Sequence, residues 1–218
     1  MTFKTKFALA TAILLWASAF VGIRAGLHGY SPEALALLRY LVASAFMALI
    51  YYFMPLKSTM RFTDICALMG VGAIGVGLYN LMLNHGEMYL ASGMTSFITS
   101  QSPIITTCFA ILFLGEQLTL GRVLGFLVSI SGVALIAFGE LGQLAWNDHI
   151  SYVIFATLAG SCYTILQKPF MKRCHAIEAT TYVVWGGTLF LAVYAPQLKQ
   201  EIAHASLATT MTVIYLGV

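Results

Sequence analysis

Charged residues are scarce in this chain. Asp, Glu, Lys and Arg together make up 9% of the 218 residues, whereas 60% of the residues are hydrophobic. Because a typical soluble domain is about 25% charged, this composition excludes an ordinary soluble domain. The net charge is only +3, and the basic residues are too dispersed to form a stripe that would bind nucleic acid. The sequence therefore predicts a polytopic protein that lies in a lipid bilayer.

Cysteines are also few, and each stands singly. Three of the four lie inside apolar segments, a pattern that indicates neither a zinc site nor a disulfide framework. We expect them to be small core residues. The five histidines lie at or near the ends of expected helices or in loops. We therefore expect no metal, no cofactor and no enzymatic site.

Long apolar runs fill most of the sequence. At about 20 residues per span, we place transmembrane helices at about 6–27, 32–54, 64–88, 91–114, 119–138, 150–168 and 177–195. An eighth begins near Leu207, but too few residues follow it before Val218 to cross a core of about 30 Å. The expected fold is all-α, with seven full transmembrane helices and the start of an eighth. Either the chain is incomplete at its C-terminus or the last segment does not span.

The basic residues of the connecting segments predict the orientation. Eight fall on one side of the expected membrane: Lys4, Lys6, Lys57, Arg61, Arg122, Lys168, Lys172 and Arg173. The other side holds only Arg24 and Lys199. Because the more basic side of a membrane protein faces the cytoplasm, the N-terminus is expected to be cytoplasmic. Tyr30, Trp146 and Tyr152 have the pattern of interfacial anchors at outer helix ends.

Residues 91–116 carry the densest polar run of the sequence. Pro103 would delete the backbone hydrogen bond to Thr99 and kink the expected helix, which membrane proteins tolerate beside a polar cavity. Gln101 favours a cavity or a contact with another helix over simple lipid-facing packing, because lipid cannot satisfy a buried amide. We predict that Thr99, Gln101, Ser102 and Pro103 line an outward-open substrate cavity with Pro103 at its floor. The hydroxyl residues that would share one helical face are Ser92, Thr95, Ser96, Thr99, Ser102 and Thr106.

The expected helix at 64–88 holds Tyr79, Asn80 and Asn84 in its outer half. These side chains would either recognise an amino or carboxylate group of a substrate or join helices by hydrogen bonds worth about 0.6 kcal/mol each. The sequence leaves both interpretations open. His85 is the nominal proton carrier, but its place near the helix end favours a solvated histidine.

Glycines and one arginine stand out in the expected helices. Gly70, Gly72, Gly75 and Gly77 would let the third helix bend. Gly121 and Gly125, with Ser129, would let the fifth helix pack closely. Arg39 lies inside the second helix, where a charge is a functional hypothesis by default. We favour a structural role for Arg39, in which it reaches outward or pairs with Glu87.

A weak internal repeat suggests how the chain is divided. The run from Ala8 to Arg24 resembles the run from Val153 to Lys168. The two runs lie five helices apart, and an odd number means that the second copy enters the bilayer from the opposite face. Inverted repeats of this kind occur in secondary transporters. We predict a first five-helix unit over residues 1–140 and an incomplete second unit over 141–218.

Motifs along the whole chain are similar to those of the drug/metabolite transporter superfamily, specifically its EamA-type ten-helix members. These motifs are Trp16-Ala17-Ser18-Ala19-Phe20, Pro32, Arg39, Ser92 to Pro103, Leu114-Gly115-Glu116, Gly121, Gly125, Gly132, Tyr163 to Arg173, and Ile214-Tyr215-Leu216-Gly217-Val218. The resemblance implies two inverted five-helix repeats around a central cavity, and transport of small metabolites or drugs across a bacterial inner membrane. It makes Trp16 and Ser18 candidate substrate contacts, with Tyr163 as the pseudo-symmetric partner of Ser18. Each of these three side chains could instead serve packing alone.

We therefore predict a multi-pass secondary transporter of the bacterial inner membrane that exports small organic metabolites, such as amino acids, by alternating access. Hydroxyls, amides and aromatic rings would recognise the substrate, since we expect no buried carboxylate that could attract a cation. Multidrug efflux and a non-transporting membrane fragment or scaffold are the alternatives. A homodimer is also open.

Overall fold

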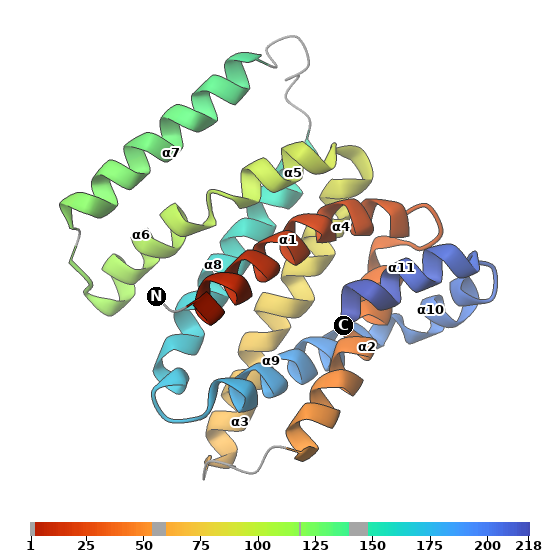
Figure 1. Cartoon of the computed structure of the whole chain (residues 1–218). Coiled ribbons are helices and arrows are strands. Elements are labelled where there is room, and N and C mark those ends of the chain that lie inside the picture. Colours follow the sequence, from red (N-terminus) through yellow and green to blue (C-terminus); the bar gives the residue numbers. More distant parts are fainter. Residues whose placement is uncertain (1–2, 54–59, 118, 140–147) are drawn as a thin grey trace.

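The fold is built from helices. A computed structural model describes residues 3–53, 60–117, 119–139 and 148–218, and every regular element in these ranges is helical (Figure 1). The predicted all-α polytopic fold is confirmed. Lys57, Trp146 and the expected boundary between residues 140 and 141 lie outside the described residues, as do the side chains of Lys4 and Arg122.

Six helical segments are long and apolar enough to cross a membrane. They are α1 (Phe3–Gly26), α2 (Pro32–Phe53), α3–η1–α4 (Phe62–Gly72, Ala73–Leu78, Tyr79–Tyr89), α5–α6 (Ser92–Thr99, Ser102–Leu114), α8 (Ile150–Met171) and α9–η2–α10 (Ala176–Leu191, Ala192–Tyr194, Ala195–Ile202). The expected fifth span corresponds to α7 (Leu120–Gly139), and the start of the eighth corresponds to α11 (Leu207–Gly217). In these two helices the apolar stretches found among the described residues, Val123–Gly132 and Leu207–Gly217, are shorter than a span.

Three of the spanning segments are irregular, and one of them is the last, in which the short 3-10 stretch η2 separates α9 from α10. The kink predicted at Pro103 is found as a full interruption, because α5 ends at Thr99 and α6 begins at Ser102 with the proline in its first turn. The third segment contains the π-helical stretch η1 between α3 and α4. A π-helical stretch carries wider turns than an α-helix and is often found at functional sites.

The glycines of the third segment allow close packing against α9. A methyl group on Gly72 would overlap the main-chain carbonyl of Val183, and one on Gly186 would overlap the main chain of Met69. The two helices therefore approach each other at backbone distance, which side chains larger than glycine would prevent. Gly75 and Gly77 instead face the rings of Tyr163 and Phe190. These glycines therefore serve packing, beyond the bending that the sequence suggests.

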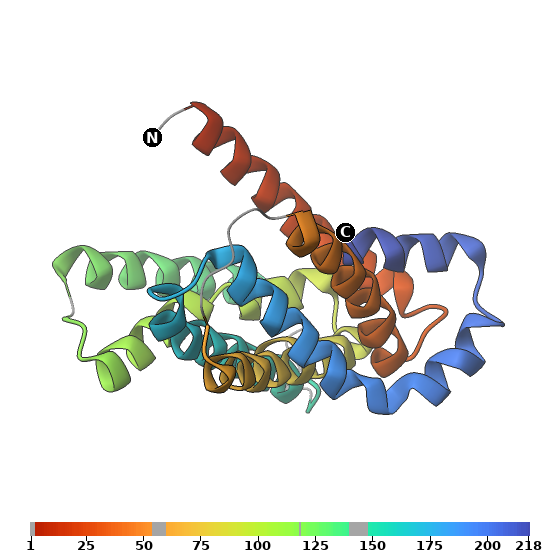
Figure 2. The ribbon, with the colours of Figure 1, turned by 90° about the horizontal axis from the view of Figure 1, so that it is seen from below.

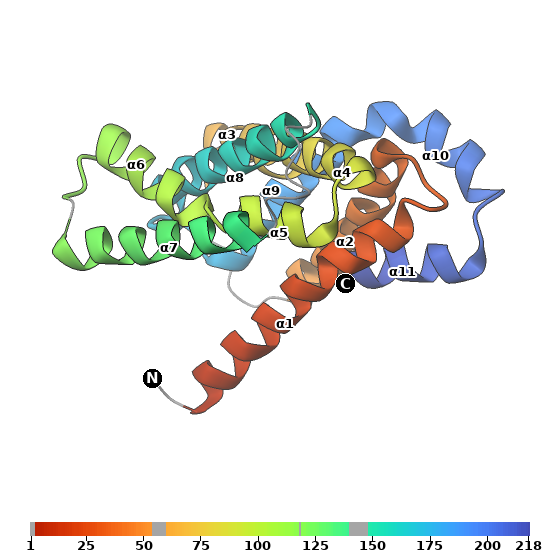
Figure 3. The ribbon, with the colours of Figure 1, turned by 90° about the horizontal axis from the view of Figure 1, so that it is seen from above.

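A buried apolar cluster lies where α1, α2, α4 and α8 come together with the end of α9. Ile23, Leu35, Leu83, Val153 and Leu191 belong to this cluster. Figure 2 shows α1 projecting from this body at its N-terminal end, and Figure 3 shows α7 at the edge beside α5 and α6. The arrangement brings α1, α2, α4, α5, α6 and α8 around one region, where a cavity is found.

The close packing expected for α7 does not occur among the described residues. A methyl group on Gly121 or Gly125 would meet open space, so these glycines do not bring another described helix close. Ser129 makes one polar contact, since its hydroxyl donates to the side-chain oxygen of Gln101 at 3.4 Å. Small residues alone therefore did not predict where helices touch.

Candidate substrate cavity

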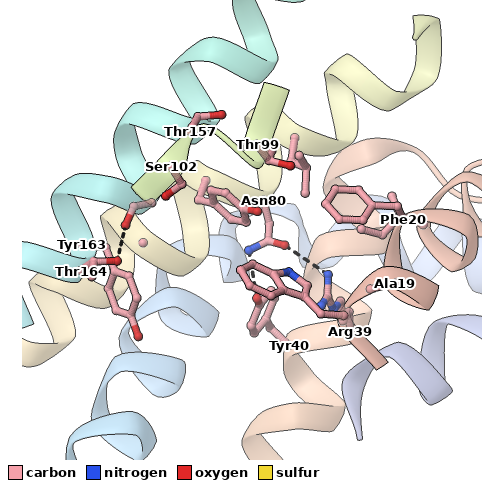
Figure 4. Close-up of a pocket in the computed structure, with 16 residues that line it drawn as sticks. Ala19, Phe20, Arg39, Tyr40, Asn80, Thr99, Ser102, Thr157, Tyr163 and Thr164 are labelled. Carbon is pink, nitrogen blue, oxygen red and sulfur yellow. Dashed lines mark hydrogen bonds between the residues drawn. The ribbon is translucent and has the colours of Figure 1, made fainter. Parts of the chain in front are cut away.

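A cavity of about 280 Å³ lies where α1, α2, η1, α4, α5, α6 and α8 meet (Figure 4). Arg39 and Phe20 lie on one side of it, Ser102 and Thr157 lie on the other side, and Asn80 lies between them. The segments that form the walls include the π-helical stretch and both halves of the interrupted helix. Two of the three irregular spans thus meet at one place.

A fixed positive charge stands on one wall. The Arg39 guanidinium donates from Nε to the main-chain oxygen of Leu216 at 3.0 Å and from Nη1 to Asn80 Oδ1 at 3.3 Å. The Asn80 amide is itself held, because its Nδ2 donates to the Tyr40 hydroxyl at 2.9 Å and to the carbonyl of Val76 at 2.8 Å. A guanidinium has five N–H donors. The contacts with Leu216 and Asn80 use Nε and Nη1 of this group, and Arg39 lines the cavity.

The opposite wall presents hydroxyl oxygens. Each of its threonines donates its proton to a carbonyl one turn earlier in the same helix, at 2.7 to 2.9 Å: Thr99 to Thr95, Thr157 to Val153 and Thr164 to Gly160. Nearby, the hydroxyls of Ser102 and Ser161 lie 3.2 Å apart. A hydroxyl whose proton is already donated offers only lone pairs to a ligand. This wall therefore accepts hydrogen bonds, whereas the Arg39 wall donates them.

Tyrosine rings and two glycines shape the remaining walls. Gly75 lies directly against the ring of Tyr163, and a methyl group on Gly160 would lie 3.2 Å from the ring of Tyr79. The glycines make room for both rings beside the cavity. Trp16 also lines the cavity but is itself 67% exposed, so it lies at the rim.

Six of the ten residues predicted to bind substrate line this cavity: Trp16, Tyr79, Asn80, Thr99, Ser102 and Tyr163. They come from four separate spanning segments, so the fold brings together side chains that are distant in the sequence. Their role in substrate binding stays a prediction.

Ser18 and Asn84 lie outside the cavity lining. The Ser18 hydroxyl bonds to the carbonyl of Leu15 at 2.8 Å and to the hydroxyl of Tyr215 at 3.0 Å. Asn84 is fully buried, and its Nδ2 donates to the carbonyl of Pro32 at 2.9 Å. Both side chains thus make contacts between helices, which is the packing role that the sequence left open for them.

Gln101 and Pro103 also lie outside the lining, although they belong to the stretch that predicted it. The interruption between α5 and α6 turns the Gln101 amide back to the carbonyl of Phe97 at 3.4 Å and toward Ser129. Pro103 is exposed in the first turn of α6. The expectation that Pro103 forms the cavity floor is therefore not met, because the adjacent Ser102 and Thr99 line the cavity instead.

Sequence reasoning did not assign four polar residues of the lining to the cavity: Arg39, Tyr40, Thr157 and Thr164. For Arg39 it favoured a structural role, reaching outward or pairing with Glu87, but the guanidinium bonds to Asn80 and Leu216. The intramembrane charge was the signal that could have assigned it to the cavity. The threonines of α8 carried no such signal, since a lone threonine in an apolar helix is common.

The ionisable side chains differ from expectation in two ways. Glu87 of α4 and Glu178 of α9 are buried, each only 1% exposed, where no buried carboxylate was expected. Glu33 lies 2.9 Å from His85 Nε2, and His85 also stacks on Tyr152 with ring centroids 5.6 Å apart. His85 is therefore a half-buried link between α2, α4 and α8, not a freely solvated histidine.

The EamA-like transporter family matches residues 4–138, which is more than half of the chain. The chain belongs to the EamA-like transporter family. The resemblance that the motifs indicated is confirmed, and with it a multi-pass membrane transporter, not an enzyme.

Named relatives agree with this family. "Uncharacterized transporter YdfC" of Bacillus subtilis (strain 168) is 37% identical over 207 residues, which are 93% of this chain and 66% of that protein. "Probable terminal-alkyne amino-acid exporter" of Streptantibioticus cattleyicolor is 33% identical over 214 residues, which are 98% of this chain and 71% of that protein. "Probable amino-acid metabolite efflux pump" of Salmonella typhimurium is 22% identical over 228 residues, or 100% of this chain and 74% of that protein. The chain thus spans about two thirds of the length of the first of these relatives.

Proposed function

We propose that this transporter exports small zwitterionic metabolites, amino acids or close relatives of them, by alternating access. The observation that carries the proposal is the polarity of the cavity. One wall holds the Arg39 guanidinium, and the opposite wall holds hydroxyl oxygens that can only accept. An amino acid carries a carboxylate and an ammonium group, so its two ends match the two walls.

The Arg39 wall suits a carboxylate. Charge-assisted hydrogen bonds from a guanidinium to a carboxylate are roughly twice as strong as neutral ones. Asn80 and Leu216 hold the Arg39 side chain in place, so little rotamer freedom remains to be lost on binding. A lipophilic cation, the usual multidrug substrate, would be repelled by the same charge.

The threonine wall suits an ammonium group. An ammonium carries three donors and no acceptor, and the hydroxyls of Thr99, Thr157 and Thr164 have already donated their protons. The names of two relatives, an amino-acid exporter and an amino-acid metabolite efflux pump, support the same substrate class.

The irregular spans at the cavity are consistent with transport by alternating access. Interrupted helices that meet at a cavity near the bilayer centre are typical of secondary transporters, in which one half of the protein rocks against the other. The first five-helix unit over 1–140 and the incomplete second unit over 141–218 would belong to these halves. We further propose a bacterial inner membrane location with the N-terminus in the cytoplasm, on the charge distribution of the connecting segments.

Replacing Arg39 by glutamine is expected to lower the transport of labelled amino acids roughly 10- to 100-fold, because a charged hydrogen bond is worth about 1.5–3 kcal/mol. Uptake of an amino-acid panel into inside-out membrane vesicles measures this. Arg61→Gln is the matched control, since Arg61 is exposed before α3 and does not line the cavity. A thermal unfolding curve of each variant separates a lost site from a lost fold. Unchanged transport by a folded Arg39→Gln protein would contradict the proposal, as would transport of lipophilic cations alone.

Cys174 provides a test of orientation. It lies between α8 and α9, on the side expected to be cytoplasmic, where burial and the carboxylates of Glu178 and Asp64 raise the pKa of its thiol. Only the thiolate reacts, so labelling by a membrane-impermeant maleimide should be slow at neutral pH and accelerate as the pH rises. In a variant that keeps only this cysteine, label is expected on inside-out vesicles and not on right-side-out ones. The reverse pattern would refute the orientation, and Asp64→Asn should accelerate labelling.

A further inference from the structure

Three polar residues of α4 form a buried stripe that begins at the cavity and runs outward. Asn80, Asn84 and Glu87 are spaced four and three residues apart, so they share one face of the helix. Each is at most 1% exposed. Asn80 lines the cavity, whereas Glu87 lies seven residues further, about 10 Å along the helix axis. The substrate site as proposed uses only the first member of this stripe.

The acceptor oxygens in the outer part of the stripe receive no hydrogen bond from the described residues. Within the described part of the chain, no donor reaches Asn84 Oδ1 or either carboxylate oxygen of Glu87. The Asn84 amide cannot turn freely, because its Nδ2 is bound to the carbonyl of Pro32 at 2.9 Å. Burying an acceptor without a donor costs about 1–3 kcal/mol, and more for a charge. Three such oxygens one helical turn apart therefore indicate that a donor is missing.

The charged groups around Glu87 do not supply that donor. From α1, Arg24 directs its Nη1 to the carbonyl of Leu90. From α2, Arg39 bonds to Asn80 and Leu216, and Glu33 bonds to His85 of α4 itself. At the start of α8, His149 stacks on Tyr89.

The positive charges of Arg24 and Arg39 act on the Glu87 carboxylate through space, but neither side chain hydrogen-bonds to it. The segment α5 carries no ionisable side chain.

We propose that Glu87 is a proton-binding site of this transporter and that Asn84 positions it. One proton converts a Glu87 acceptor oxygen into a donor, and Asn84 Oδ1 lies one turn away on the same face to accept that bond. A single proton thus satisfies two of the three orphaned oxygens and removes the buried charge.

The proton site is linked to the substrate site through Arg39, a step that rests on the proposed function. Deprotonated Glu87 offsets part of the positive potential at Arg39, and protonation removes that offset. At a separation of about 10 Å and an effective dielectric constant of about 20, the change corresponds to roughly a tenfold gain in affinity for a carboxylate. Proton and substrate therefore favour each other's binding by the same factor. Efflux would draw on the gradient of the substrate itself and not on proton entry.

The proton site can be tested without any substrate. Infrared difference spectra of the reconstituted protein, recorded between acidic and alkaline pH, are expected to show a carboxylic acid band that Glu87→Gln removes and that Asn84→Ala shifts. His85→Gln, which changes the neighbouring titratable residue, should leave the band in place. If the wild-type band is absent, or survives in Glu87→Gln, the proton site is wrong.

Binding and flux then test the linkage. The affinity for a labelled amino acid should rise about tenfold from alkaline to acidic pH, whereas Glu87→Gln should hold the high affinity at every pH. A pH-sensitive dye should report protons leaving with the substrate in the wild type and none in Glu87→Gln. Three results would each overturn the proposal. These are an affinity that falls on acidification, protons that move in the direction opposite to the substrate, and binding that requires sodium at fixed pH. Absence of amino-acid binding beside an intact Glu87 band would refute only the substrate class and its linkage.

Discussion

Replacing Gly72 by alanine is expected to destabilise the protein by about 3 kcal/mol or more, at the upper end of the cost of overpacking. The added methyl group would overlap the main-chain carbonyl of Val183. A flexible side chain could move aside, but a helix backbone cannot yield without separating α3 from α9. The melting temperature and the yield of folded protein in detergent, compared between the variant and the wild type, measure this effect.

Gly70 offers a matched control in the same helix. A methyl group there meets nothing within 4 Å, so Gly70→Ala should be neutral or slightly stabilising, since alanine has the higher helix propensity. Gly186→Ala should reproduce the loss from the opposite side of the contact, because its methyl group would overlap the main chain of Met69. Equal stability of the Gly70 and Gly72 variants would show that the close contact between α3 and α9 does not contribute to the fold.

Asn80→Asp is expected to retain a folded protein and yet lower amino-acid transport roughly 10- to 100-fold. The Asn80 oxygen already accepts from Arg39 Nη1, so an aspartate there would form an ion pair with Arg39 at the cavity. That pair would occupy the charge that the substrate carboxylate needs. Asn80→Leu, in contrast, should fail to fold well, because it leaves the Arg39 charge without its partner.

The substrate itself provides the control for this variant. An amino-acid amide has an ammonium group but no carboxylate, so its transport should be retained or increased in Asn80→Asp. Parallel uptake measurements with the amino acid and its amide, in the same vesicles, give the ratio. If both compounds lose transport equally, Asn80 serves the fold and does not determine the charge of the substrate.

Much of the fold could be predicted because a bilayer imposes simple rules on a sequence. Helices at 32–54, 64–88 and 91–114 were expected from apolar length alone, and each is found within a few residues of its expected bounds. Pro103 gave the interruption, since proline removes a backbone donor wherever it stands. Packing partners could not be predicted in this way. Gly72 and Gly121 look alike in sequence, yet only Gly72 meets another helix.

The candidate site was predictable only in part, for a related reason. Asn80 and Thr99 could be selected because polar groups inside a membrane segment need an explanation. Whether such a group faces a cavity or a neighbouring helix depends on rotation of the helix about its axis. Asn84 and Gln101 turned out to face other helices, and Thr157 turned out to face the cavity. The rotation of each helix about its axis is determined by its packing against other helices, and the sequence of one segment alone does not specify that packing.

The π-helical stretch η1 gives the third span an adjustable register. An i→i+5 turn holds about one residue more than an α-helical turn, and one residue corresponds to about 100° of rotation. If the widened turn between Ala73 and Leu78 tightened to α-helical geometry, all of α4 would swivel relative to α3. Asn80, Asn84 and Glu87 would then turn away from α2 as a unit. Tightening this single turn could thus move Asn80 out of the cavity lining and the Glu87 carboxylate away from α2 in one step, without unfolding either helix.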